Sequence, residues 1–163
     1  MGTVLGGMRH VRWHELRHAY GSASQVPGTL SRIAWGDGPT AEEALSDLGQ
    51  WIGEPAVFDS TVAAVPFLWE LVATETVKDR AGVLELLGTI LTSGHALHPE
   101  WTRAAHEAVA AGRPTAARLA TASRTSATSP QQAVRDSAVR TSAVRLLAAL
   151  DEHTCSTCLP RTA

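Results

Sequence analysis

A glutamate near the start of the chain is flanked by two histidines, in the sequence His14-Glu15-Leu16-Arg17-His18. If this segment is an α-helix, the histidines lie on one face and can bind a zinc ion together. The glutamate between them can then serve as the general base of a metalloprotease. The alternative is a helix surface on which this spacing arises by chance. The residue types therefore permit hydrolytic zinc chemistry without requiring it.

This motif lacks a third zinc ligand. A longer form of the motif places a third histidine where this chain has Ser24, and serine is a poor zinc ligand. Glu42 or Glu43 would have to supply the third ligand from another part of the chain. Arg17 also puts a charge on a helix face that metalloproteases bury. We therefore expect no catalytic residue and no cofactor, and the two histidines remain weak candidates for binding a metal.

The remaining histidines and the two cysteines form two further groups of potential ligands. His95 and His98 bracket a predicted loop, and His106 follows shortly after them. Cys155 and Cys158 form a Cys-x-x-Cys pair near the C-terminus, close to a further histidine. Redox pairs of this type lie at a helix N-terminus, which lowers a thiol pKa, whereas this pair follows a predicted helix. A zinc site would need more ligands, so we expect a tail with free thiols.

Composition and charge favour one helical, globular domain. The chain has 163 residues, enough for a single core, and its 44% hydrophobic content is mostly alanine and leucine, which favour helices. Twelve acidic residues against three basic ones make 37–107 acidic, whereas 1–36 and 108–163 are basic. A general nucleic-acid binder would have a dominant basic surface, so we do not expect nucleic acid as a partner.

No stretch of the sequence has the length and apolarity of a signal peptide or of a membrane span. We therefore expect a cytoplasmic protein without a membrane partner.

The chain also repeats itself. The stretch VPGTLSRIA at 26–34 is similar to VPFLWELVA at 65–73 and to RPTAARLA at 113–120. A second apolar set recurs with a spacing of 39 residues: Ala44, Leu45, Leu48 and Ile52 correspond to Val83, Leu84, Leu87 and Leu91. This second set has helical spacing and predicts one buried face. Each repeat therefore indicates two helices, the first with a proline near its start or inside it.

Hydrophobic periodicity and helix-start signals predict eight helices, over 8–19, 24–34, 40–52, 59–74, 79–93, 99–111, 114–122 and 131–150. Thr40 and Pro99 are the expected starts of two of them. The polar segment 123–130 is an expected loop insertion in the third repeat.

A repeat of this length with two helices is typical of HEAT and armadillo proteins. The chain resembles HEAT-repeat proteins, and the stretches at 13–27 and 60–71 look like the opening of a group of uncharacterised bacterial members. The resemblance implies an all-α fold of about seven or eight helices. These would form a short right-handed solenoid over 1–152, followed by a flexible tail at 153–163.

The function that this resemblance implies is non-enzymatic binding of another protein or a peptide. The concave surface would be formed mainly by the second helices, around 40–52, 79–93 and 131–150. Two alternatives stay open at this point. One is zinc-dependent hydrolysis through His14, Glu15 and His18, and the other is nucleic-acid binding through the basic ends of the chain.

Overall fold

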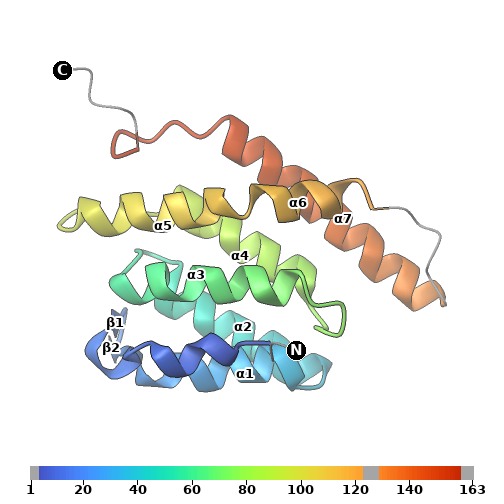
Figure 1. The fold of residues 1–163 in the computed structure, drawn as a ribbon, viewed down its shortest axis with the longest axis horizontal. Coiled ribbons are helices and arrows are strands. Elements are labelled where there is room, and N and C mark those ends of the chain that lie inside the picture. The colour runs from blue at the N-terminus through green and yellow to red at the C-terminus, as the bar shows by residue number, and fades with distance from the viewer. Residues whose placement is uncertain (1–3, 123–128, 159–163) are drawn as a thin grey trace.

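The computed structural model of this protein describes residues 4–122 and 129–158. Within those ranges the backbone forms seven α-helices and one small hairpin (Figure 1). The hairpin strands, Arg17–His18 (β1) and Gly21–Ser22 (β2), have two residues each, so the all-α expectation is confirmed. None of the described helices has both the length and the apolar character needed to cross a bilayer.

Over residues 4–25 the described N-terminal segment folds without an α-helix, so the helix predicted over 8–19 is wrong. Short 3₁₀ helices surround the hairpin instead, at Gly6–His10, Trp13–Glu15 and Ala23–Gln25. Figure 1 shows this segment in blue, running beside α1 and turning at the hairpin.

Distant partners explain why this segment is not helical. The backbone N–H of Arg17 donates to Oδ1 of Asp59 at 2.9 Å, and that of Ala19 donates to the carbonyl of Trp51 at 3.0 Å. In an α-helix both N–H groups would bond within the helix. The buried side chains Trp13 and His18 are also five positions apart, which on a helix would point them about 140° away from each other.

The first helix pair is α1 (Val26–Trp35) and α2 (Gly38–Ile52), close to the predicted ranges 24–34 and 40–52. The start of α2 differs from the prediction because Asp37, and not Thr40, is the N-cap. Oδ1 of Asp37 accepts a hydrogen bond from the backbone N–H of Thr40 at 2.9 Å. This bond satisfies a donor that the first turn of a helix leaves free.

The second pair is α3 (Asp59–Val72) and α4 (Arg80–Thr92), which confirms the helices predicted at 59–74 and 79–93. Pro66 lies inside α3, unlike Pro27, which lies in the first turn of α1. A proline inside a helix removes one backbone hydrogen bond.

Three helices follow: α5 (Pro99–Ala111), α6 (Arg113–Ala120) and α7 (Pro130–Asp151). They correspond to the predicted ranges 99–111, 114–122 and 131–150, and α5 begins at Pro99 as expected. The loop predicted at 123–130 falls mostly on 123–128, outside the described residues.

Helices that are neighbours in the chain pack together: α1 contacts α2, α3 contacts α4, and α6 contacts α7. Contacts between pairs join α1 to α3 and α3 to α5 on one side, and α2 to α4 and α4 to α7 on the other. Figure 1 shows α1, α3 and the continuous α5–α6 segment as three roughly parallel rods stacked in that order. Buried apolar side chains from Leu5 to Leu150 form a single cluster through this stack.

The repeated apolar face is the main contribution of α2 and α4 to this cluster. Ala44, Leu48 and Ile52 are buried, and so are the counterparts 39 residues later, Val83, Leu87 and Leu91. The prediction of one buried face on each helix is confirmed for these six residues. Leu45 is only half-buried and lies at the margin of the face.

Candidate functional site

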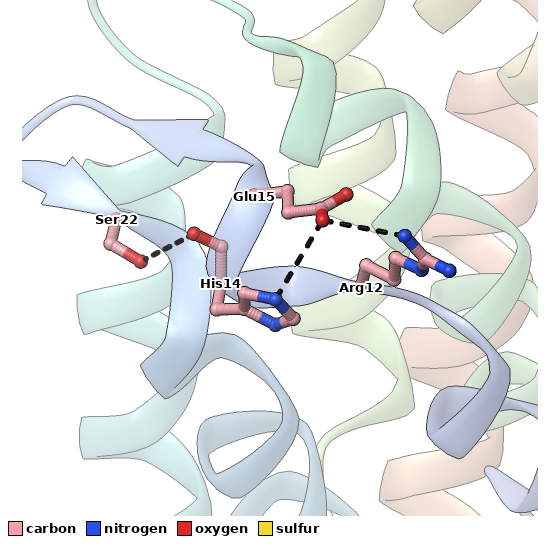
Figure 2. Close-up of polar contacts among 4 residues, drawn as sticks. All are labelled: Arg12, His14, Glu15 and Ser22. Carbon is pink, nitrogen blue, oxygen red and sulfur yellow. Dashed lines mark hydrogen bonds and ion pairs between the residues drawn. The ribbon is translucent and has the colours of Figure 1, made fainter.

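The histidine–glutamate motif lies on two different elements. His14 and Glu15 belong to the 3₁₀ helix Trp13–Glu15, whereas His18 is on strand β1. Figure 2 shows the His14 and Glu15 side chains beside Arg12 at the surface. Oε1 of Glu15 is 3.4 Å from Nη1 of Arg12 and 3.8 Å from Nε2 of His14. The His14 and Glu15 side chains are 72% and 54% exposed, so this is a solvated charge cluster of small energetic value.

His18 is buried and packs the hairpin against α2. Its ring stacks on Trp51, with centroids 5.0 Å apart and planes 13° apart. Nδ1 of His18 accepts from the backbone N–H of Tyr20 at 3.0 Å. Burial lowers the pKa of His18 because the apolar surroundings disfavour the charged imidazolium. The two histidines thus have different surroundings and do not share a helix face.

The other residues considered for this motif do not complete a metal site. Ser24 is exposed on a 3₁₀ helix, and Glu42 and Glu43 are exposed on α2. Among the described residues, one group of three or more potential ligands lies close together. It includes residues of the C-terminal segment and none of this motif.

His95 and His98 form an aromatic cluster without His106. The ring of His98 stacks on Trp101 at 3.6 Å, and the ring of His95 meets Trp101 edge-on at 5.2 Å. Nδ1 of His98 lies 2.9 Å from Oε1 of Glu100. These contacts fix the α4–α5 loop against the first turn of α5.

His106 instead faces the C-terminal segment, where it meets the cysteine pair. The four residues that converge are His106, His153, Cys155 and Cys158, and we call them the His–Cys cluster. One potential ligand atom from each lies within 4.8 Å of the others. His106 is 4% exposed and comes from α5, while the other three are half-buried and follow α7.

Two residues one turn apart on α5 hold the C-terminal segment in place. Nε of Arg103 donates to the carbonyl of Thr157 at 3.0 Å, and Nδ1 of His106 lies 3.3 Å from Sγ of Cys158. The segment itself turns tightly, because the backbone N–H of Cys158 donates to the carbonyl of Cys155 at 3.0 Å. Cys-x-x-Cys turns of this kind bring two sulfurs toward one point.

Hydrogen bonding determines the tautomer of His106. Its Nε2 lies 2.7 Å from the carbonyl oxygen of Ser93, which can only accept, so Nε2 carries the proton. Nδ1 is then left with a lone pair that points toward Cys158. The ring of His153 stands perpendicular to that of His106, with centroids 4.8 Å apart. Nε2 of His153 is buried and has no hydrogen-bond partner among the described residues.

The two thiols have different electrostatic surroundings. The pKa of Cys158 is raised to about 11, because burial disfavours the thiolate and the neighbouring Cys155 adds to the effect. Burial also works to raise the pKa of Cys155, but hydrogen bonds from Thr157 and Cys158 outweigh it, and the pKa is lowered overall. Burial lowers the pKa of His106, which is therefore held in its neutral form.

The sequence predicts the cysteine pair with His153 close to it, but it does not predict His106 as their partner. It groups His106 with His95 and His98 instead, and it predicts a tail with free thiols for the cysteines. The periodicity of α5 carried a usable signal, since His106 falls on the same buried face as Thr102, Ala105 and Val109. A histidine on the apolar face of a helix needs a polar partner in the interior.

A groove between α4 and α7 is the second candidate site. We call this space of about 330 Å³ the α4–α7 groove. Its walls include Leu84, Glu85, Gly88, Ser142, Arg145 and Leu146. A methyl group added at Gly88 would contact nothing within 4 Å, so the groove is open above this glycine. A larger space of about 680 Å³ shares Thr92 and Ala149 with the groove and reaches the His–Cys cluster.

Comparison of the chain with protein-family models, with characterised proteins and with solved structures finds no match.

Proposed function

We propose that this protein is a non-enzymatic interaction module, a HEAT-like stack of helix pairs that binds a protein or peptide segment in the α4–α7 groove. The order of contacts supports the stack, because each pair packs on the next through both of its helices. The second helices α2, α4 and α7 contact one another in sequence. A solenoid uses this row of second helices as its binding surface.

The groove is the observation that carries the proposal. Its apolar floor comes from Leu84 and Leu146, and Glu85 and Arg145 put opposite charges on its walls. A segment with an apolar anchor residue between two polar or charged residues fits this chemistry, because the anchor loses water while the flanking groups stay solvated. Gly88 leaves room for such an anchor to approach the backbone of α4.

The positions of the motif residues favour this function over zinc-dependent hydrolysis. A metalloprotease needs two histidines on one helix face with the glutamate between them. His14 is exposed on a 3₁₀ helix, and His18 is buried against Trp51. The groove offers an alternative function that does not depend on this segment.

A matched pair of arginine substitutions tests the proposal. Gly88→Arg would fill the groove. Gly28→Arg places the same side chain at an exposed position of α1, where an added Cβ also meets nothing within 4 Å. Peptides selected by the wild-type protein from a random display library should bind Gly28→Arg with unchanged affinity. They should bind Gly88→Arg about tenfold more weakly or worse, a change of about 1.4 kcal/mol.

Two results would count against the proposal. One is equal affinity of the selected peptides for Gly88→Arg and the wild type. The other is a library selection that enriches no peptide. Both variants should keep the circular dichroism spectrum of the wild type, which separates loss of binding from loss of folding.

A further inference from the structure

We propose that the His–Cys cluster binds one zinc ion, which fastens the segment 153–158 to α5. The ligands would be two imidazoles and two thiolates, a set that suits zinc in a closed, four-coordinate structural site. The site is independent of the α4–α7 groove and requires no reaction at the metal.

The distances within the cluster are close to those that zinc requires. With Zn–S near 2.3 Å and Zn–N near 2.0–2.1 Å, tetrahedral geometry puts neighbouring ligand atoms about 3.3–3.8 Å apart. Nδ1 of His106 and Sγ of Cys158 are already 3.3 Å apart, and no pair of the four ligand atoms exceeds 4.8 Å. The widest separation would have to shorten by about 1 Å, which side-chain torsions in a short surface segment can supply.

The groups that contact the cluster orient its side chains as the surroundings of a bound metal do. Histidines that bind zinc almost always donate the other ring N–H to a carbonyl or carboxylate. His106 meets this condition through the carbonyl of Ser93 at 2.7 Å, and its free Nδ1 faces the cysteines. The turn from Cys155 to Cys158 is closed by the backbone N–H of Cys158, which donates to the carbonyl of Cys155 at 3.0 Å.

His153 supplies an independent observation. Its Nε2 is buried beside His106 without a hydrogen-bond partner among the described residues. A buried nitrogen without a hydrogen-bond partner is unfavourable, so it calls for a partner such as a metal. Zinc bound there would give this nitrogen its partner and would displace the two thiol protons to solvent.

A redox role for the cysteine pair is a weaker explanation. A reactive Cys-x-x-Cys pair is activated by the positive end of a helix dipole. Cys155 and Cys158 instead follow the C-terminal end of α7, and they share the cluster with two imidazoles that a dithiol reaction does not need.

The experiment measures zinc in the 163-residue chain, produced without a histidine tag and kept reduced. After incubation with equimolar zinc and desalting, mass spectrometry of the metal should find one zinc per chain. Cobalt(II) in place of zinc should give the visible spectrum of a tetrahedral thiolate site. Cys155→Ser and Cys158→Ser should each weaken zinc binding about tenfold or more. His14→Ala, the matched control from the N-terminal motif, should bind zinc like the wild type.

Hydrogen exchange gives a second measurement that does not depend on how well the variants fold. Removing the metal from the wild type with a chelator should speed exchange in 153–158 and leave α1 unchanged, because only the C-terminal segment is held by the ion. Wild-type protein that retains no zinc would overturn the proposal. So would full zinc binding by both cysteine variants, loss of zinc in His14→Ala, or exchange in 153–158 that does not respond to the chelator.

Discussion

Adding one methyl group at each of two glycines should change stability in opposite directions. Gly112 joins α5 to α6, and a Cβ built there would lie only 1.8 Å from Cε2 of Trp69. Carbon atoms in contact prefer about 3.5–4.0 Å, so the indole of Trp69 would have to move by about 1.7 Å. Trp69 is 8% exposed in a continuous core, which leaves little room for that movement.

The expected cost of Gly112→Ala is about 1–3 kcal/mol if the core adjusts around the indole. It rises to about 3–5 kcal/mol if Trp69 is expelled from its site. Backbone strain does not add to this cost, because the φ of −87° at Gly112 is accessible to alanine. Gly112 is also the N-cap of α6, where alanine is less favourable than glycine, so a loss beyond about 1 kcal/mol measures how closely α3 approaches the α5–α6 junction.

Gly88→Ala is the matched control. This glycine lies inside α4, and the added methyl would meet nothing within 4 Å. Alanine favours the helix over glycine by about 1 kcal/mol, so this variant should be more stable than the wild type. Urea unfolding followed by circular dichroism would measure both variants. A Gly112→Ala protein as stable as Gly88→Ala would refute the packing of Trp69 on Gly112.

Three further predictions concern the core, the hairpin and the N-terminal motif. Leu87→Ala should lower the free energy of unfolding by about 2–5 kcal/mol, since Leu87 is fully buried; a loss near zero in urea titration would contradict its place in the core. The pKa of His18 is lowered in the fold, so the unfolded chain binds more protons there, and stability should fall as pH drops below about 6.5. His18→Gln should make the urea midpoint less sensitive to pH between 8 and 5, and an unchanged pH dependence would argue against a neutral, buried His18. Glu15→Gln should change stability by less than about 0.5 kcal/mol and leave peptide binding intact, because its ion pairs are exposed; a larger loss would show that this cluster has a role beyond the surface.

The helices from 26 onward could be predicted because their apolar spacing is a local property. Leu48 and Leu87 face the core for the same reason. Each lies on the apolar face of a helix that packs against the preceding helix. The N-terminal segment could not be predicted in this way. Its backbone groups bond to Asp59 and Trp51, and no local pattern around Arg17 reports those partners. The helical spacing of His14 and His18 therefore predicts a helix, but the bonds to Asp59 and Trp51 give this segment a different backbone structure.

The His–Cys cluster shows the same limit at the other end of the chain. The tail residues His153, Cys155 and Cys158 are adjacent in sequence, but His106 precedes Cys158 by 52 residues. It reaches them because the segment after α7 runs over α5, where Arg103 and His106 contact it. The path of this segment depends on where α7 ends and on the bond from Arg103, and neither can be predicted from ligand spacing.

Hydrogen exchange of the protein with and without a selected peptide tests the proposed function most directly. A peptide bound in the α4–α7 groove should slow exchange in α4 and in the second half of α7, the two elements that line the groove, and leave α1 unchanged. Slower exchange confined to α1 and the N-terminal hairpin, or no change in α4 and α7, would contradict the account.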